Sequence, residues 1–291
     1  MARGGIDLHM HTVISDGTDS PEEILSRVRA AGIGLFSVTD HDALKGSRIV
    51  PALLTKGDPC FLSGVEFSCK DGQGKYHILG YGYDPEGAAI RSVVDHGHRL
   101  RMEKAAARLE FLKTEFGFDF PPEEVSGLMA LDNPGKPHIG NLMVKYGYAE
   151  TKETAIRQYL NRLHFRSEYV GPEEAIRGIV ESGGVPVLAH PAYGDGDQLI
   201  LGEELDMRVQ RLMDWGLRGL ECFYSGFTER LRREALSLAE RYELYITCGS
   251  DYHGGNKLVE LGDTGLVGEG EYPSGLRRFL EDMKRHVYSA V

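Results

Sequence analysis

The stretch Gly5-Ile6-Asp7-Leu8-His9-Met10-His11 opens the pattern that decides the fold. Its first four residues predict a short strand, and a His-x-His pair follows directly. Ser20-Pro21-Glu22-Glu23 then supplies a cap residue, a proline at the first helical position and acids in the first turn, which predicts the start of a helix. A second strand is expected at 35–38. This strand–helix–strand unit predicts parallel strands joined by a crossover helix.

The same alternation continues along the chain. Strand-like apolar runs are expected at 61–65, 76–81, 185–189, 219–223 and 244–247. Residues 89–165 break the pattern, because they contain helical patterns only. We therefore expect an α/β domain formed by residues 1–88 and 166–291, with a helical insertion domain at 89–165 that covers the active site.

Composition restricts the function. The 291 residues carry a net charge of −11, which does not favour a stable complex with long nucleic acid, although metal ions in an acidic protein can still bind a small anion. No apolar run approaches the roughly 18 residues that span a bilayer, and the N-terminus does not resemble a secretory signal. Cytoplasmic residence and no membrane partner are expected; the pattern gives no expectation for oligomeric state. The four cysteines form no CxxC pair and are expected to be reduced thiols.

Polar side chains gather where the predicted strands end. His9 and His11 follow the first strand, Asp40 to Asp42 the second, Glu66 the third, His190 the fifth, and Asp251 with His253 the last. In barrels of alternating strands and helices, these ends build one shared site. Each residue alone has an ordinary structural explanation, such as a helix cap or a solvated acid. Together they predict a metal site, and imidazole with carboxylate suits zinc, manganese or iron.

Several of these segments resemble, in order, the polymerase-and-histidinol-phosphatase (PHP) family. The matching motifs run from one end of the chain to the other: Asp7-Leu8-His9-Met10-His11, Ser15-Asp16-Gly17, Thr39-Asp40-His41-Asp42, Gly64-Val65-Glu66-Phe67-Ser68, His77-Ile78-Leu79-Gly80-Tyr81, Ala189-His190-Pro191 and Gly249-Ser250-Asp251-Tyr252-His253-Gly254. The chain is most similar to the stand-alone phosphoesterases of the family, which include nucleoside 3′,5′-bisphosphate phosphatases.

The resemblance implies a distorted seven-stranded (β/α) barrel with two to three divalent ions, Mn²⁺, Fe²⁺ or Zn²⁺. It implies that one ion is held by His9, His11, Glu66 and Asp251, a second by Glu66, His77 and His190, and a third by Asp16, His41 and His253. One of the aspartates at 7, 40 and 42 is expected to orient a metal-bound histidine, with Asp40 preferred.

The expected activity is hydrolysis of a phosphate ester of a small metabolite, with the 3′-phosphate of a nucleoside 3′,5′-bisphosphate as the best guess. The nucleophile would be a metal-bridging hydroxide. Glu66, Asp251 and His253 are the expected catalytic residues, and His253 or a metal-bound water would protonate the leaving group. Arg166, His138 and Lys257 are the expected phosphate-binding residues, although an arginine at the surface, a helix cap and a solvated lysine are their ordinary alternatives.

Other functions stay open at this point. The same ions would support a phosphodiesterase acting on a small cyclic phosphate or 5′–3′ on RNA or DNA ends, and histidinol phosphate is a further substrate within the family. An alternative of another class is a metal-binding module without activity. A pocket closed by the insertion would favour a small substrate, whereas an open basic groove would favour a polymer.

Overall fold

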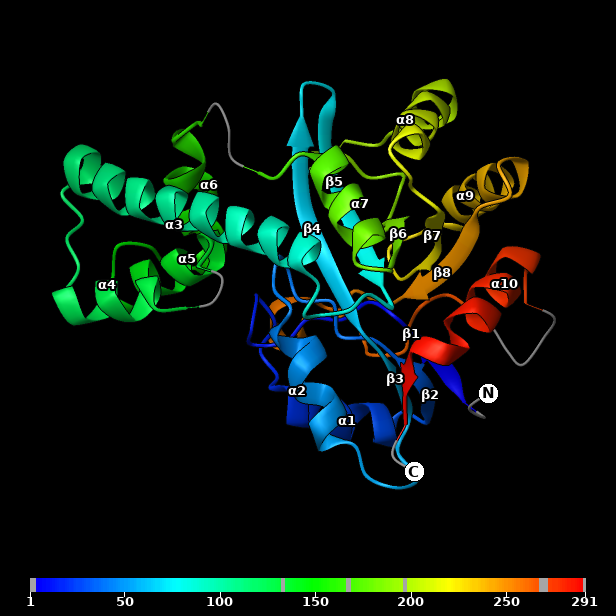
Figure 1. Ribbon diagram of the computed structural model, residues 1–291. Coiled ribbons are helices and arrows are strands. Elements are labelled where there is room, and N and C mark those ends of the chain that lie inside the picture. The colour runs from blue at the N-terminus through cyan, green and yellow to red at the C-terminus, as the bar shows by residue number, and fades with distance from the viewer. Residues whose placement is uncertain (1–3, 132–133, 166–168, 196–197, 267–271, 290–291) are drawn as a thin grey trace.

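The computed structural model describes residues 4–131, 134–165, 169–195, 198–266 and 272–289. Its strands lie in two sheets with helices around them (Figure 1). The smaller sheet has the order β1 (Gly5–Asp7), β2 (Ile33–Phe36), β3 (Cys60–Leu62), β9 (Val287–Tyr288). The larger has the order β4 (Gly64–Asp71), β5 (Gly74–Tyr81), β6 (Val185–Leu188), β7 (Gly219–Tyr224), β8 (Tyr245–Gly249). The predicted α/β class is confirmed.

The first unit of the chain folds as its sequence predicts. β1 and β2 pair in parallel, and α1 (Pro21–Ala30) lies between them in the chain. The Glu23 amide donates to the Ser20 hydroxyl at 3.2 Å, and the Ser20 amide donates to the Glu23 carboxylate at 2.7 Å. Two amides that the helix leaves without a partner are thereby satisfied, so α1 starts at its predicted cap.

Five further helices flank the strands: α2 (Lys45–Leu53), α7 (Pro172–Glu181), α8 (Gly202–Asp214), α9 (Glu229–Arg241) and α10 (Ser274–Met283). Two short turns of 3₁₀-helix, η2 (Gly254–Asn256) and η3 (Lys284–His286), follow β8 and α10. No helix in the described ranges is long and apolar enough to cross a membrane.

β5 departs from the expected parallel arrangement, because it is antiparallel to both β4 and β6. Only residues 72 and 73 separate β4 from β5, and a parallel crossover needs about a dozen residues. The expected strand at 61–65 is also divided, since β3 ends at Leu62 and β4 begins at Gly64. Glu66 therefore lies inside β4, and the expectation that it follows a strand was wrong.

A single closed barrel of seven strands is not what the described residues form. Their ladders belong to two separate sheets, and two isolated parallel bridges, Met10 with Tyr252 and His41 with Glu66, connect the sheets at one end. The Asp42 amide adds a hydrogen bond to the Glu66 carbonyl at 2.9 Å. The segments that follow β1, β2 and β8 thus converge beside β4.

Between β5 and α7 the described residues form helices and loops only: α3 (Ala88–Phe116), α4 (Pro122–Met129), α5 (Lys136–Lys145), α6 (Lys152–Gln158) and the 3₁₀ turn η1 (Leu160–Arg162). We call α3 to η1 the helical segment. Figure 1 shows α3 reaching from the sheets outward to α4, α5 and α6. Ile90 at its start belongs to the main core, whereas Leu112 belongs to a second core with Phe120 and Ile139. α3 therefore contributes to both cores. The expected domain limits of 89–165 stay a prediction.

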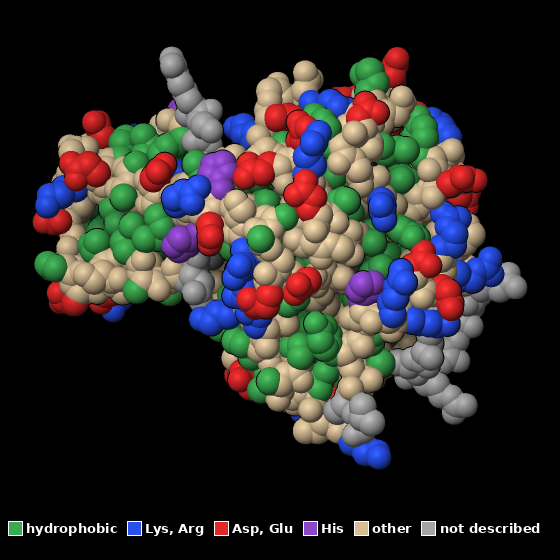
Figure 2. All heavy atoms as spheres, in the orientation of Figure 1, with side chains coloured by type: hydrophobic (Ala, Val, Ile, Leu, Met, Phe, Trp, Pro, Cys, Tyr) green, Lys and Arg blue, Asp and Glu red, His purple; other side chains and the backbone are tan. Residues whose placement is uncertain are grey.

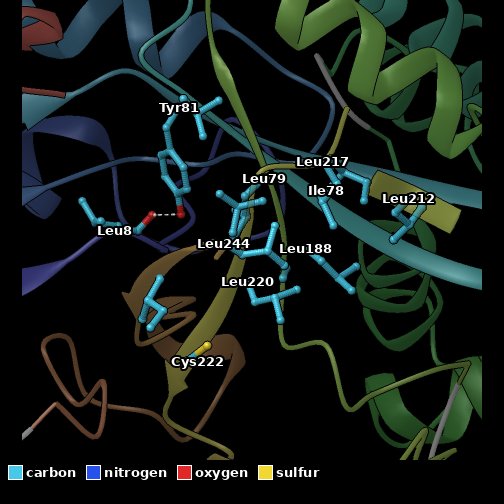
Figure 3. Packing of buried hydrophobic residues seen from close by; sticks show 14 of the residues in the cluster. Leu8, Ile78, Leu79, Tyr81, Leu188, Leu212, Leu217, Leu220, Cys222 and Leu244 are labelled. Carbon is cyan, nitrogen blue, oxygen red and sulfur yellow. Dashed lines mark hydrogen bonds between the residues drawn. The ribbon is translucent and has the colours of Figure 1, made fainter. Parts of the chain in front are cut away.

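The main core supports the strands that carry the polar residues. Figure 3 shows Leu79 of β5, Leu188 of β6 and Leu220 of β7 close together. The Tyr81 hydroxyl donates to the Leu8 carbonyl at 2.9 Å, directly before His9. All four cysteines are free, and all but the half-buried Cys60 are buried, as expected.

Candidate metal centre

Nine histidines and carboxylates that the sequence singled out meet where the two sheets converge. His9, His11, Asp16, His41, His190, Asp251 and His253 follow strands β1, β2, β6 and β8, whereas Glu66 and His77 lie within β4 and β5. Glu66 stands at the centre. Its two carboxylate oxygens lie 2.9–3.4 Å from ring nitrogens of five histidines: His9, His11, His41, His77 and His190.

The first group of donor atoms comprises His9, His11, Glu66 and Asp251, the four residues expected to share one ion. The atoms lie within 4.8 Å of one another, and all four residues are buried. The Nε2 atoms of His9 and His11 each lie 3.4 Å from the Asp251 Oδ1 atom. Two imidazole nitrogens and two carboxylate oxygens therefore face one small volume, which is a donor set suited to a divalent transition metal.

A second group comprises His11, Asp16, His41 and His253, and a third comprises His41, Glu66 and His77. The second contains all three residues expected for one ion, with His253 Nε2 at 3.3 Å from Asp16 Oδ1. The third contains His41 where His190 was expected. His190 still reaches the Glu66 carboxylate, at 3.4 Å from its Nε2 atom.

Unsatisfied buried atoms show that these residues fit a metal. Among the described residues, His9 Nε2, His11 Nε2, Asp16 Oδ1 and Glu66 Oε1 are buried and make no hydrogen bond of acceptable geometry. A buried polar atom without a partner costs about 1–3 kcal/mol. All four atoms face the groups described above, so divalent ions would satisfy them together.

Glu221 of β7 orients two of these histidines and was not among the residues that the sequence singled out. Its buried carboxylate lies 2.9 Å from His9 Nδ1 and accepts the His190 amide at 2.8 Å. A proton on Nδ1 donated to Glu221 leaves His9 Nε2 with a lone pair directed at the group. The available signal was one acid inside the apolar strand 219–224, which is a costly position unless the acid has a partner.

We call the segments that follow β1, β2, β6 and β8, together with Glu66 and His77, the rim. The three aspartates considered for that orienting role hold the backbone of the rim instead. Asp40, the preferred one, accepts bonds from the Thr12 amide and hydroxyl and from the Ser15 hydroxyl at 2.7–2.8 Å. Its link to a histidine runs through Ser15, whose hydroxyl is 3.4 Å from His11 Nδ1. Asp7 joins the ends of β1 and β8 through the Ser250 amide and hydroxyl, at 2.9 and 2.6 Å.

Asp42 connects the rim to the helical segment. It accepts the Ser68 amide at 3.0 Å and pairs with Arg101 of α3, whose Nε atom is 2.7 Å away. Arg101 also donates to the Ser68 hydroxyl at 3.1 Å, and that hydroxyl lies 3.4 Å from His41 Nδ1. The helical segment is therefore coupled to the site by a partly buried charge pair.

Unusual backbone conformations direct several of these side chains. Of the four described non-glycine residues with positive φ, Asp42 (50°), His190 (28°) and Asp251 (59°) lie at the site, and only Glu243 does not. Such conformations are strained for residues with a Cβ atom and persist where the surrounding structure enforces them. Their concentration here indicates that the surrounding structure fixes the direction of these side chains although their backbone is strained.

The charges of the site depend on the balance between burial and neighbours. Burial lowers the pKa of His11, but the Asp251 and Glu66 carboxylates outweigh it and raise the pKa to about 10. At His41 burial dominates, and the pKa falls well below its usual value. Burial raises the pKa of Glu66, but the surrounding histidines more than offset this and hold it well below the ordinary range. At neutral pH the Glu66 carboxylate is therefore ionised and His11 carries a proton between carboxylates that could instead bind a cation.

The expected phosphate-binding residues have different surroundings. The Lys257 ammonium contacts Asp251 Oδ2 and lies 3.1 Å from the Tyr224 hydroxyl, which itself donates to Asp251 at 3.0 Å. His138 Nδ1 accepts the Gly135 amide at 3.2 Å at the start of α5. Arg166 lies outside the described residues.

A pocket of about 320 Å³ opens onto the site. Lys257, Asn256 and seven of the nine histidines and carboxylates line it, as do Pro137 and Lys152 of the helical segment. The pocket is therefore bounded by the sheets on one side and by α5 and α6 on the other.

Comparison with known proteins gives several similarities that cover most of the chain, although no family model matches it. A 3′,5′-nucleoside bisphosphate phosphatase from Chromobacterium violaceum is 32% identical over 85% of this chain and 87% of that protein. A phosphoribosyl 1,2-cyclic phosphate 1,2-diphosphodiesterase from Eggerthella lenta is 29% identical, over 85% of this chain and 94% of that protein. A 5′–3′ exoribonuclease from Haemophilus influenzae is 26% identical, over 88% and 92%.

Two solved structures have the same fold along nearly their whole length. One is an amidohydrolase from Chromobacterium violaceum with bound sulfate and no metal, with a TM-score of 0.79 and 26% identity, covering 97% of both chains. The other is a metal-dependent phosphoesterase from Bifidobacterium adolescentis, with a TM-score of 0.79 and 27% identity, covering 96% of this chain and 97% of that one.

Proposed function

Because the chain belongs to the PHP family of metal-dependent phosphoesterases, we propose that it removes the 3′-phosphate of a nucleoside 3′,5′-bisphosphate. One observation carries the choice of a small substrate: the helical segment contributes Pro137 and Lys152 to the pocket above Glu66 and the histidines. A volume of about 320 Å³ lies within the usual range for small-molecule sites. The relative of highest identity reported above is named a 3′,5′-nucleoside bisphosphate phosphatase.

The nine histidines and carboxylates are the proposed ligands of two to three divalent ions, Mn²⁺, Fe²⁺ or Zn²⁺. Bound ions supply Lewis acidity toward water and toward the phosphate oxygens. The chain itself orients the donors, since Glu221 fixes His9, Asp40 and Ser15 hold the loop after His11, and Lys257 with Tyr224 holds one oxygen of Asp251. Glu66 and Asp251 are proposed as catalytic residues, because their carboxylates would bind the same ions as the phosphate.

His253 is the proposed proton donor to the leaving group. Its Nδ1 atom donates to the Asp251 carbonyl at 2.9 Å, so Nε2 is the atom directed toward Asp16 and the pocket. Nε2 can hold either a metal or a proton, so His253 would donate the proton when two ions are bound elsewhere, and a metal-bound water would donate it when a third ion occupies His253. Replacing His253 should reduce hydrolysis of alkyl phosphates more than that of aryl phosphates, whose leaving groups need less protonation; equal losses would count against the proton-donor role.

Phosphodiester hydrolysis is the second candidate, because relatives named as a cyclic phosphate diphosphodiesterase and a 5′–3′ exoribonuclease are also similar over most of the chain. Figure 2 shows Lys and Arg side chains interspersed with Asp and Glu on the face it presents, rather than one continuous basic track. Electrostatic binding of a polymer depends on such a track. That face therefore does not favour a polymer, and the pocket lined by Pro137 and Lys152 favours the small substrate.

A panel of phosphate esters tests the proposal. The purified protein would be assayed for phosphate release with added Mn²⁺ on a nucleoside 3′,5′-bisphosphate, nucleoside monophosphates, a cyclic phosphate and a 5′-phosphorylated oligonucleotide. We expect the highest kcat/KM for the bisphosphate, loss of activity with a chelator and recovery with metal. Preference for the cyclic ester or the oligonucleotide would replace the proposal with the second candidate.

A further inference from the structure

Lys152 lines the metal-site pocket but is not among the residues expected to bind metal or phosphate. It belongs to α6 of the helical segment, yet it lines the same pocket as Asp16, His41 and Glu66. We infer that Lys152 forms a subsite for the second, non-scissile phosphate of the substrate. This inference rests on the proposed function, because it assigns the part of a bisphosphate that the metals do not hold.

Packing fixes the stem of this lysine. Gly140 of α5 faces it, and a Cβ atom on Gly140 would lie 3.2 Å from Lys152 Cγ and 3.4 Å from the Lys152 carbonyl oxygen. A residue without a side chain thus lets the lysine stem pass close to α5. The Lys152 side chain is only 21% exposed, so its amine has a restricted range of positions.

A hydrogen-bond chain fixes the amine. Lys152 Nζ donates to Asn256 Oδ1 at 2.9 Å, and Asn256 Nδ2 donates to the Asp16 carbonyl at 2.7 Å. Because its amide NH₂ is engaged by the rim, Asn256 presents its oxygen to the lysine. The ammonium is thereby held across the pocket from the sheets, between α6 and η2, with further N–H groups left for a ligand.

Lys152 has a weaker ion pair than Lys257 and Arg101, two other cations near the site. Lys257 is paired with the buried Asp251, and Arg101 is paired with the buried Asp42. Among the described residues, Lys152 forms an ion pair with Glu153, at 4.0 Å and with a side chain 71% exposed, where water screens the interaction. Lys152 instead contacts a neutral amide, which a phosphate oxygen can replace or join.

The chemistry of the pocket then separates two anionic groups. The histidine and carboxylate donors gather at its floor, and metals held there would take the phosphate that is cleaved. A second phosphate on the same small molecule needs a cation away from the floor, and an ammonium with several donors suits a phosphate. The ligand class is a small molecule with two phosphate groups on separate positions.

Selectivity between two matched substrates tests the subsite. We would measure kcat/KM for adenosine 3′,5′-bisphosphate and adenosine 3′-monophosphate, which differ only in the second phosphate. In Lys152→Met the ratio of the two values should fall by about tenfold or more, the loss expected for one charge-assisted hydrogen bond. Lys113→Met, at an exposed lysine of α3 paired with Asp119, is the matched control and should keep the wild-type ratio. An unchanged ratio in Lys152→Met overturns the inference.

Two further variants guard against a folding defect. Lys152→Arg keeps the charge and should keep most of the ratio. Gly140→Ala favours the helix but pushes the lysine stem, so its ratio should lie between those of the wild type and Lys152→Met. A Gly140→Ala protein with the wild-type ratio would contradict the placement of the amine.

A binding measurement separates this inference from the proposed function. Adenosine 5′-monophosphate retains only the second phosphate, so its affinity relative to adenosine, measured by calorimetry on the metal-loaded protein, needs no turnover. We expect Lys152→Met to weaken the nucleotide about tenfold and adenosine little. If Lys152→Met weakens adenosine 5′-monophosphate but not adenosine, and the wild type hydrolyses no ester, the subsite is retained and the phosphatase is rejected. If the wild type hydrolyses the bisphosphate but Lys152→Met binds the nucleotide as the wild type does, the phosphatase is retained and the subsite is rejected.

Discussion

The rim of the sheets and the helical segment bury different kinds of side chain. At the rim, His9, His11, Asp40 and Glu66 are almost completely inaccessible, and Asp251 is buried as well. In the described part of 88–165 the buried side chains are apolar apart from Lys104 and Arg108. Buried polar groups are costly unless they are paired, whereas buried apolar groups stabilise directly. Substitutions should therefore reduce activity most at the rim and stability most in the helical segment.

Glu66→Gln should reduce activity most of all, so it is the strongest test of the comparison between the rim and the helical segment. The substitution keeps the shape of the side chain but removes the charge that five histidines face. Because breaking a buried charge pair costs about 3–5 kcal/mol, we expect kcat/KM to fall on the order of a thousandfold. Phosphate release and metal content would be measured together.

Glu240→Gln, at an exposed position of α9, is the control for this loss of charge and should behave as the wild type. If Glu66→Gln kept both its metal and its activity, the central position of Glu66 would have no functional meaning.

Glu221→Gln tests whether orientation alone matters at the rim. The residue touches His9 and the His190 amide but is not among the proposed ligands. Loss of such a partner typically costs 10–100-fold in metal affinity or activity. We expect that loss in the dissociation constant for Mn²⁺, with the far-UV circular dichroism spectrum preserved. Wild-type metal affinity in this variant would show that the carboxylate serves packing only.

The sequence predicted the rim better than it predicted the strands that build it. Histidines and acids next to apolar runs can be found locally, and the Ser20–Glu23 capping box is local as well. Glu221 could not be assigned to His9, because 212 residues separate them and only the closing of the structure joins them. The reversal of β5 could not be predicted, because the expected strand ended at residue 65, whereas β4 continues to Asp71 and leaves only residues 72 and 73 before β5.

Proton competition should make metal binding depend on pH. The raised pKa of His11, about 10, means that the metal-free site holds protons at neutral pH. A metal must displace them, so its affinity should rise with pH by about tenfold per unit for each proton released. Affinity for Mn²⁺ at pH 6, 7 and 8 would be measured by competition with an indicator. An affinity that is constant or falls with pH would contradict the proton-loaded state of the rim.

His138 sharpens the comparison at the border between the two regions, where the smallest effect is expected. Burial lowers the pKa of His138, so the neutral ring accepts the Gly135 amide through Nδ1 and presents an Nε2 proton on its other side. His138→Ala should lower the free energy of unfolding by about 1 kcal/mol, the usual loss at a helix start, as measured by urea denaturation. His138→Gln, which keeps an acceptor at the third helical position, should recover most of that stability. A role at the helix start alone would leave kcat/KM for the bisphosphate close to that of the wild type in both variants. A fall in kcat/KM in His138→Gln with stability restored would instead assign the Nε2 proton to the substrate and extend phosphate recognition from Lys152 to the start of α5.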